Sequence, residues 1–578
     1  MALVIYYDGD CPFCRRYVRY LRLDRTVGSV TLEDVRQNPE ARLALERQGF
    51  NLDEGMVVDM DGRRVGGADA VNALALLSTP VGVFNRLNRL LLASPRMSRF
   101  LYPVLRSGRW AVLFLLGRRG FTDDDAGTLA RTAIFARFFA LFSFFHFFNY
   151  SLEYGRFPPG LDQLALVCSA IALFFWPRSS RLLWLLMLTS AISAAVQAPV
   201  QSNHTMVRNV VVAGYWLSFA MAMFRGSNWQ AVFQRFAPAG QGALLVMYFF
   251  GIFHKLNSDF LNPASSCAVV LWREMPVPLR LLEGRLVDLA TIYGTLVIEG
   301  LLIAMLLNRR LRHLGIAIGI LFHLLLAMSN YAMYISFTML AIALHSLFLG
   351  DRAATVILGS SEMQLIQSRL RDPVYIVALL VLAVSMALAA ATGANSLVTL
   401  LMLPVILPFC WLVMRYGKSG EHLLDRQAPL SMNVVGGAIT VLFFANCLMP
   451  YLGLKSAQAV NMYANLRLEG GVSNHLIMPV PGPFNYLEQV AVVEDAGSDS
   501  VLEGYRRNGF AIVYYDLLAR LSVTPDNTVT FTLDGDRFEQ VRAEDFSEQI
   551  NATVHPVWFR KWFHFQPVEL GRPEHCKN

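Results

Sequence analysis

Two cysteines separated by two residues, Cys11 and Cys14, stand near the start of the chain in the stretch YYDGDCPFC. A C-x-x-C pair that follows a strand and opens a helix is typical of a thiol-disulfide exchange site. The free N–H groups and the dipole of a helix N-terminus stabilise a thiolate on the first cysteine. The second cysteine lies one turn on, within reach of a mixed disulfide. The spacing predicts a redox-active dithiol in which Cys11 attacks and Cys14 resolves.

Charged residues beside the pair act in both directions. Asp8 and Asp10 disfavour a thiolate, and Arg15 and Arg16 partly offset them. A zinc half-site and a buried structural pair are the alternative interpretations. Zinc sites normally use four ligands, whereas residues 1–115 contain no second C-x-x-C and no Cys/His cluster. No metal is therefore expected here.

A second set of ionisable residues lies within or beside long apolar segments, where such groups are costly and each is a candidate for function. Snorkelling or capping is the favoured role for Arg137 and His345. An interfacial anchor is the alternative to a functional role for Lys255, and simple pairing with a neighbouring helix is the alternative for Glu299. The whole set comprises Arg137, His146, His204, His254, Lys255, Glu299, His323 and His345.

The composition of the chain indicates a membrane protein. Of its 578 residues, 54% are hydrophobic and 16% are charged, whereas soluble domains carry roughly 25% charged residues. The apolar residues stand in long blocks, and a backbone surrounded by lipid satisfies its own hydrogen bonds as a helix. About eleven spans are predicted, near 132–150, 161–177, 181–199, 208–224, 241–257, 287–307, 311–329, 331–349, 374–393, 395–414 and 433–453.

Basic residues in the loops set the expected orientation. Lys and Arg gather after the even-numbered spans, and the positive-inside rule assigns those loops to the cytoplasm. The N-terminus is then cytoplasmic and the C-terminus exoplasmic, in what we expect to be a bacterial inner membrane. The net charge of +7 comes from these loops, so no nucleic-acid partner is expected. A cytoplasmic pair rests reduced and acts catalytically.

Alternating strands and helices must position the dithiol. Strands are predicted at 3–7 and 30–35, helices from the C-P-F-C motif to residue 23, near 39–48 and at 68–77, and a hairpin at 56–65 that turns on Asp61-Gly62. YYDGDCPFC resembles the Y-D-G-x-C-x-x-C signature of the DCC family of thiol-disulfide oxidoreductases, and VVDMDG and GGADAV fit the same family. This resemblance covers residues 1–115 and implies a thioredoxin-like fold with a redox role for Cys11 and Cys14.

Four stretches of the apolar part resemble vitamin K-dependent γ-carboxylases and their horizontally transferred transmembrane relatives. They are FARFFALFSF (135–144), QSNHTMVRN (201–209), YFFGIFHKLNSDFL (248–261) and FHLLLAMSNYAMYISFTMLA (322–341). The resemblance implies that Lys255 is a catalytic base acting on a vitamin K-type hydroquinone, and that His204 stabilises or positions the intermediate. A lysine held away from water gives up its proton more readily than an exposed one, as such a base requires.

The same resemblance makes Asn203, His254, Asn257, Glu299 and His323 candidate cofactor-binding residues. Two positions depart from the family pattern. His254 stands where the carboxylases carry a second lysine, and Asn257 replaces an aspartate.

Residues 455–578 are polar and rich in predicted strands. TVTFTLDGDRFEQV (528–541) alternates around Asp534-Gly535, as a hairpin does. VWFRKWFHF (557–565) mixes aromatic and basic residues, which is typical of a membrane interface.

The other chemistry-bearing residues lack such signals. Arg467 and His475 fit ordinary loop residues better than parts of an exoplasmic mouth. Cys168, Cys267, Cys410, Cys447 and Cys576 have no motif spacing and are predicted to be small apolar residues.

Three parts are therefore expected: a thioredoxin-like α/β domain (1–115), an all-α membrane bundle (116–454) and a small β-rich exoplasmic domain (455–578). The expected function is thiol-disulfide oxidoreduction by the cytoplasmic dithiol, coupled to a bundle that acts on a quinone or hydroquinone. The expected partners are a protein thiol or disulfide, the lipid bilayer and a lipophilic quinone. One alternative is a carboxylase-like or epoxidase-like enzyme with Lys255 as base, and the other is a transporter or membrane anchor for the redox domain.

Overall fold

The computed structural model describes most of the chain in two compact units. The described residues are 2–21, 27–52, 55–79, 81–115, 126–153, 158–198, 202–225, 229–331, 334–369, 372–418, 433–478, 482–571, 573–574 and 576–577. One unit comprises Met1–Leu129, Ser179–Arg181 and Tyr215–Phe236, and the other Ala130–Arg178, Leu182–Gly214 and Ala237–Asn578. Each unit is described by itself.

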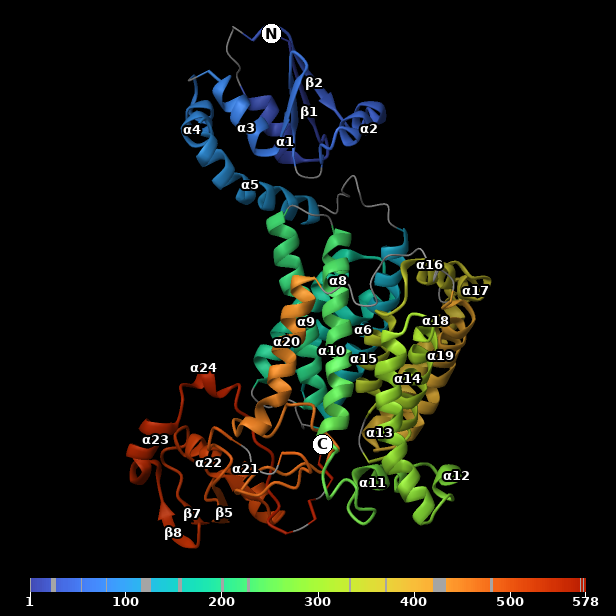
Figure 1. Ribbon diagram of the computed structural model, residues 1–578, viewed down its shortest axis with the longest axis vertical. Coiled ribbons are helices and arrows are strands. Elements are labelled where there is room, and N and C mark those ends of the chain that lie inside the picture. The colour runs from blue at the N-terminus through green and yellow to red at the C-terminus, as the bar shows by residue number, and fades with distance from the viewer. Residues whose placement is uncertain are drawn as a thin grey trace. The chain divides into compact units, whose positions relative to one another are not determined.

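A four-stranded sheet forms the centre of the N-terminal α/β domain, drawn in blue in Figure 1. Its strands are β1 (Leu3–Tyr7), β2 (Val30–Asp34), β3 (Val57–Met60) and β4 (Arg63–Gly66), in the order β2-β1-β3-β4. β1 and β2 are parallel, and β3 is antiparallel to both β1 and β4. A parallel pair needs a crossover connection, and α1 (Pro12–Tyr20) lies in it. The strands predicted at 3–7 and 30–35 are confirmed.

The β3–β4 hairpin shows how a local signal sets a register. Asp61 and Gly62 have φ angles of 50° and 89°. A two-residue turn with positive φ at both positions matches the twist of the strands, and Asp-Gly adopts it with little strain. The predicted hairpin is confirmed, with Met60 opposite Arg63.

Four more helices complete this domain: α2 (Pro39–Arg47), α3 (Gly67–Leu76), α4 (Val83–Leu92) and α5 (Pro95–Leu115). The Asn38 side chain caps α2 by accepting from the Ala41 N–H at 3.1 Å. The predicted extension of α1 to residue 23 falls on residues 22–26, which lie outside the described part of the chain.

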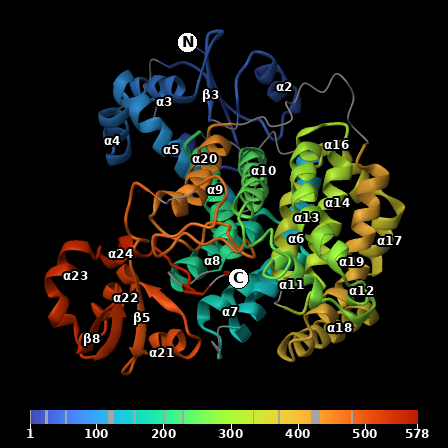
Figure 2. The same ribbon diagram turned by 60° about the horizontal axis from the view of Figure 1, so that its bottom comes forward.

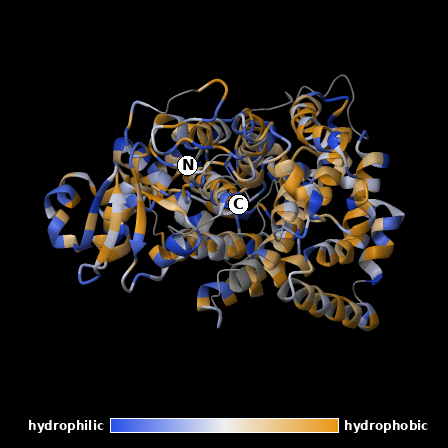
Figure 3. Ribbon diagram, turned by 90° about the horizontal axis from the view of Figure 1, so that it is seen from below, coloured by the Kyte–Doolittle hydropathy of each residue, from blue (hydrophilic) through white to orange (hydrophobic). Residues whose placement is uncertain are grey.

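Seven helices of the described residues are long and apolar enough to cross a membrane, which indicates an integral membrane protein. They are α6 (Ala126–Glu153), α8 (Ser180–Gln197), α9 (Asn203–Arg225), α10 (Trp229–His254), α13 (Arg285–Leu307), α19 (Asn395–Tyr416) and α20 (Val434–Leu448) with its continuation η1 (Met449–Leu452). Apolar residues run along many of the helices (Figure 3).

The predicted count of eleven spans is not confirmed. The other predicted spans fall on three shorter apolar helices and one bent pair. The short helices are α7 (Leu161–Phe175) and α14 (Arg312–Ala327), together with the Pro373–Met386 part of α18 (Pro373–Ala391), and the pair is α15 (Ile335–Ser346) with α16 (Asp351–Gly359), bent by 115°. α14 packs against α13, α15 and α19, and α18 packs against α19 (Figure 2). The remaining helices before the C-terminal region are α11 (Cys267–Arg273), α12 (Val277–Arg280) and α17 (Ser361–Arg369).

A second, antiparallel sheet follows in the C-terminal region, with the order β6-β5-β7-β8. The strands are β5 (Val490–Asp495), β6 (Ala511–Val513), β7 (Val529–Leu533) and β8 (Asp536–Val541), and the helices are α21 (Ser500–Arg507), α22 (Tyr514–Leu521), η2 (Ala543–Phe546), α23 (Ser547–Thr553) and α24 (Val557–Arg560). The predicted hairpin on Asp534-Gly535 is confirmed, again with positive φ at both residues. Trp558 and Trp562 are exposed, and their position at a membrane interface stays a prediction.

Candidate functional site

The C-x-x-C pair lies where β1 leads into α1. Cys11 is the N-cap of α1, Pro12 takes the first helical position, and Cys14 follows one turn later. The backbone N–H of Cys14 donates to Cys11 Sγ at 3.1 Å. The first N–H groups of a helix have no partner within the helix, so a negatively charged sulfur at the N-cap satisfies one of them. This position favours a thiolate on Cys11.

Buried charges stand beside the pair. The Asp8 carboxylate is 3% exposed and accepts from Arg36 Nε at 2.7 Å and from an Arg109 guanidinium N–H at 2.8 Å. Arg109 comes from α5, 101 residues along the chain. The guanidinium groups of Arg36 and Arg109 therefore offset the negative charge of Asp8, which would otherwise disfavour a thiolate. Arg15 and Arg16, which were predicted to do so, are exposed.

These neighbours shift the pKa values of the two thiols in opposite directions. A hydrogen bond from the Cys14 thiol and the positive charge of Arg109 lower the pKa of Cys11 to about 6, although burial acts in the opposite direction. The hydrogen bond to Cys11 and burial raise the pKa of Cys14 well above its ordinary value. At neutral pH the pair therefore holds a thiolate on Cys11 and a proton on Cys14. A nucleophile beside a protonated thiol is the resting state that disulfide exchange requires.

Both sulfur atoms are shielded from solvent. Cys11 has no exposed surface and Cys14 is 7% exposed, whereas Phe13 between them is 53% exposed. The two cysteines belong to a hydrophobic core to which α5 contributes Leu113. A protein disulfide can reach Cys11 only after local opening of the segments that cover it.

Replacing Arg109 by methionine is expected to raise the pKa of Cys11, because the variant loses a positive charge and a donor that favour the thiolate. The pH midpoint of Cys11 alkylation by iodoacetamide should move upward by about one unit or more. Arg99→Met is the matched control, since Arg99 lies on the same helix but pairs with Asp69 and has a side chain that is 70% exposed. An unchanged midpoint in Arg109→Met would remove Arg109 from the thiolate site.

The larger unit contains a cavity of about 510 Å³ among α10, α11, α13, α14 and the segment 460–463. Most of its lining is apolar, and Lys255, Glu299 and His323 supply the ionisable groups, together with tyrosines such as Tyr248. An apolar cavity with a few convergent polar groups is the usual form of a small-molecule site. Three of the residues that the sequence singled out thus share one wall.

Lys255 and Glu299 form a buried ion pair across this cavity wall. Lys255 Nζ donates to the two carboxylate oxygens of Glu299 at 2.7 Å and 2.9 Å, and the residues are 8% and 7% exposed. Glu299 therefore has a pairing partner, as its simpler interpretation requires. A paired ammonium is not a base, so a base role for Lys255 would first require transfer of its proton, and Glu299 is the acceptor in contact with it.

A tyrosine that lines the cavity contacts two histidines. The Tyr248 hydroxyl lies 2.9 Å from His323 Nε2 and 3.1 Å from His345 Nε2. His345 Nδ1 donates to the Ala341 carbonyl at 2.7 Å. A neutral His345 would then accept through Nε2, with the Tyr248 hydroxyl donating to it and accepting from His323. His345 has no exposed surface, so it does not snorkel. Its position in the last turn of α15 and its bond to a carbonyl of that helix are compatible with capping, the other role predicted for it.

Four other candidates from the resemblance are not among the described residues that line this cavity: Asn203, His204, His254 and Asn257. The His204 ring is 6.4 Å from that of Phe337, whose ring is 5.3 Å from that of His323, so Phe337 contacts both histidines. Asn203 Oδ1 accepts from the Val460 N–H at 2.9 Å, and Val460 lines the cavity.

His254 and Asn257 hold the backbone around Lys255. His254 contacts the Tyr451 hydroxyl at 2.7 Å and the Ala459 carbonyl at 2.9 Å. The Asn257 amide donates to the Ala464 carbonyl at 2.6 Å and accepts from the Phe260 N–H at 2.8 Å. These contacts are those of positioning residues, one layer behind the cavity.

His475, predicted to be an ordinary loop residue, is also buried and tied to the end of α10. Its Nε2 lies 2.8 Å from the Phe253 carbonyl. His475 and Phe253 are 222 residues apart, so their spacing in the sequence gives no signal of this contact.

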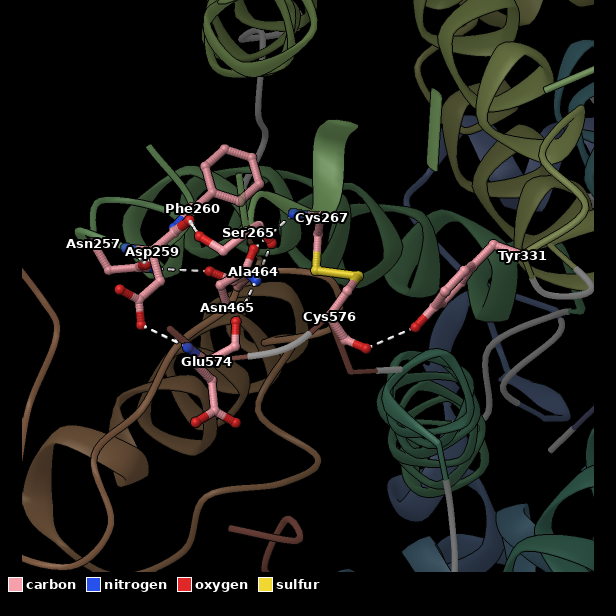
Figure 4. The surroundings of a disulfide bond; sticks show 10 residues. All are labelled: Asn257, Asp259, Phe260, Ser265, Cys267, Tyr331, Ala464, Asn465, Glu574 and Cys576. Carbon is pink, nitrogen blue, oxygen red and sulfur yellow. Dashed lines mark hydrogen bonds between the residues drawn. A yellow bond between two sulfur atoms is a disulfide. The ribbon is translucent and has the colours of Figure 1, made fainter. Parts of the chain in front are cut away.

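Cys267 and Cys576 form a disulfide, with their Cα atoms 5.0 Å apart (Figure 4). The prediction that both are small apolar residues was wrong. Their separation of 309 residues gives no spacing signal that could have paired them. Cys11 and Cys14 are free thiols. Within the described part of the chain, no group of three or more His, Cys, Asp or Glu side chains is placed to hold a metal ion.

Comparison with known proteins bears on the N-terminal site. Neither a curated protein nor a solved structure matches the chain. The resemblance of the bundle to the γ-carboxylases thus stays a prediction. Residues 5–114 match the family of DCC1-like thiol-disulfide oxidoreductases. That range holds β1, the Cys11–Cys14 pair, Asp8 and Arg109, so the chain carries an N-terminal DCC1-like thiol-disulfide oxidoreductase domain.

Proposed function

We propose that the N-terminal domain exchanges disulfides with a protein partner through Cys11 and Cys14, on a thioredoxin-like fold. The observation that carries the proposal is the N-cap position of Cys11, whose sulfur accepts from the Cys14 N–H at 3.1 Å. The element order β1-α1-β2-α2-β3-β4-α3 and the mixed sheet support the fold. The test is capture of a partner in a mixed disulfide with Cys11 when Cys14 is replaced by serine.

The exchange balances within the pair. The Cys11 thiolate attacks one sulfur of the partner disulfide, forms a mixed disulfide and releases the other partner sulfur as a thiolate. Cys14 then loses its proton and attacks the Cys11 sulfur, which frees the second partner thiol and leaves a Cys11–Cys14 disulfide. Two electrons pass to the partner, and the dithiol becomes the disulfide. A quinone in place of the protein disulfide would take two electrons from the dithiol, with one proton from Cys14 and one from water, and become a hydroquinone while the Cys11–Cys14 disulfide forms; this is the proposed link to the membrane bundle.

A second candidate function is favoured by the cavity. We propose that the bundle binds a lipophilic quinone-type molecule there, with its polar end at Lys255, Glu299 and His323. The apolar lining and the buried ion pair support this ligand class. In this proposal Lys255 acts as the base after passing its proton on, as in a carboxylase-like or epoxidase-like enzyme, and His204 and Asn203 support the wall. A transporter or an anchor for the redox domain is the alternative, and Lys255→Arg separates the two.

We propose further that the N-terminal domain (1–115) is cytoplasmic, that the bundle (116–454) spans a bacterial inner membrane and that residues 455–578 are exoplasmic. The Cys267–Cys576 disulfide supports this orientation, because disulfides persist in oxidising compartments and are rare in the cytoplasm. The distribution of basic loops supports it independently.

Reporter cysteines are expected to reveal the orientation. Cys11 and Cys14 are too buried to serve, but Ala44 on α2 and Ser547 on α23 are exposed. Each reporter is introduced into a variant of the protein in which Cys11, Cys14 and Cys168 are replaced. In spheroplasts that express it, a membrane-impermeant maleimide should label Ser547→Cys. It should label Ala44→Cys only after the membrane is permeabilised. The reverse pattern would invert the orientation.

A further inference from the structure

The C-terminal tail lies against the segments that build the cavity wall. Figure 4 shows Glu574 and Cys576 among residues of the segments 257–267 and 464–465. The Glu574 N–H donates to Asp259 Oδ2 at 3.0 Å, and its carbonyl accepts from the Asn465 amide at 2.9 Å. Asp259 immediately precedes Phe260, which lines the cavity beside Lys255.

The last described residues bind two more segments, one of which lines the cavity. The Cys576 carbonyl accepts from the Tyr331 hydroxyl at 2.7 Å. The Lys577 carbonyl accepts from the backbone N–H of Tyr463, a cavity residue, at 2.9 Å. Lys577 also pairs with Glu574. Tail contacts therefore reach segments that lie more than a hundred residues apart in sequence.

The disulfide fixes this tail at the start of α11. Cys267 is the first residue of α11, and Ala268, Leu271 and Trp272 on the same helix line the cavity. The Cys267 N–H donates to Asn465 Oδ1 at 2.8 Å, so the helix start and the 462–465 segment are joined directly. Cys576 packs on the hydrophobic cluster that contains Phe260, Tyr334 and Tyr463.

A segment held only by a few hydrogen bonds opens readily, because its residues gain conformational freedom on release. The covalent bond removes that freedom. We infer that Glu574, Cys576 and Lys577 form a strap, anchored by the Cys267–Cys576 disulfide, that holds the wall of the Lys255–Glu299 cavity in place. The strap does not depend on which ligand the cavity takes; only the ligand named in its test rests on the proposed function.

Reduction opens the strap in a balanced step. A dithiol reagent such as dithiothreitol supplies two electrons and two protons, the S–S bond breaks, and Cys267 and Cys576 become thiols while the reagent becomes its cyclic disulfide. The released tail no longer presents its backbone groups to Asp259, Asn465, Tyr331 and Tyr463. The cavity wall then loses one of its supports.

Amide hydrogen exchange on the full-length protein in lipid nanodiscs tests the strap. In Cys576→Ser, peptides that cover 257–268 and 462–466 should exchange at least about tenfold faster than in wild type, because the wall opens locally more often. Peptides from β5 and β7 should be unchanged. Cys410→Ser is the matched control, since the Cys410 thiol already donates to the Ala317 carbonyl and serine can do the same.

Reduction of the wild type provides a second route to the same state. It should accelerate exchange in the same peptides, and it should have no further effect there on Cys576→Ser. Unchanged exchange of the wall in wild type, with mass spectrometry showing that the disulfide is broken, would overturn the strap. Menaquinone serves as the cavity probe and should bind at least about tenfold more weakly after reduction. If menaquinone does not bind to the oxidised wild type, this result counts against the quinone proposal alone. The strap is tested separately by amide hydrogen exchange.

Discussion

Replacing Cys11 by serine is expected to lower the rate at which the purified protein reduces insulin disulfides by about three orders of magnitude or more. The reason is that a serine hydroxyl stays protonated at neutral pH and does not attack a disulfide, whereas Cys11 is a thiolate there. The neighbours that favour the thiolate, the Cys14 N–H and Arg109, remain in the variant but have no sulfur to act on. No mixed disulfide with a partner should be detected.

Cys14→Ser should behave in the opposite way. Its Cys11 thiolate can still attack, but no thiol is left to resolve the product, so the mixed disulfide accumulates. Non-reducing electrophoresis and mass spectrometry of the captured species measure this outcome and identify the partner. Cys168→Ser removes an exposed thiol of α7 and should change neither result. Wild-type behaviour of both Cys11→Ser and Cys14→Ser would mean that the pair is structural.

Replacing Lys255 by methionine is expected to lower the free energy of unfolding by about 3–5 kcal/mol, because it leaves the buried Glu299 carboxylate without its ionic partner. The double variant Lys255→Met/Glu299→Gln should recover most of this loss, since no unpaired charge remains. Denaturant unfolding in detergent micelles measures both variants. Equal stability of the single and double variants would show that loss of the 2.7 Å ion pair does not leave Glu299 as a destabilising unpaired charge.

Lys255→Arg separates the structural role of this residue from a chemical one. Guanidinium keeps the positive charge and does not deprotonate in proteins. The variant should therefore fold and insert normally yet lose quinone-dependent turnover. Lys455→Arg is the matched control, because Lys455 is also buried but lies outside the cavity lining and instead donates to Asn446 Oδ1 at 2.6 Å. An active Lys255→Arg protein would exclude the base mechanism and favour a transporter or an anchor.

The features that the sequence by itself determined are those that depend on a few neighbouring residues. Asp61-Gly62 and Asp534-Gly535 predict their hairpins because positive φ at two successive positions is a demand that those residue pairs meet locally. The N-cap position of Cys11 follows from the strand before it and Pro12 after it. Long apolar segments predict helices because lipid leaves the backbone no other partner.

The helices that fall short of a span show the limit of this reasoning. Hydropathy measures how apolar a segment is, but helix length is set by where packing and turns end it. The segment predicted at 331–349 holds α15, which has only 12 residues and is followed, after Gly350, by α16 at an angle of 115°. The bend therefore lies at the end of the predicted span and not in its middle.

The partners of the reactive groups were decided by the tertiary structure alone. Arg109 reaches the dithiol from α5, Glu299 meets Lys255 from α13, and Tyr248 joins His323 to His345 only when α10, α14 and α15 pack together. Cys267 and Cys576 meet across 309 residues. The residue type alone gives a side chain's charge and hydrogen-bonding capacity. Its partner, however, is whichever group the packed chain brings within about 3 Å. Sequence spacing carries no record of that approach.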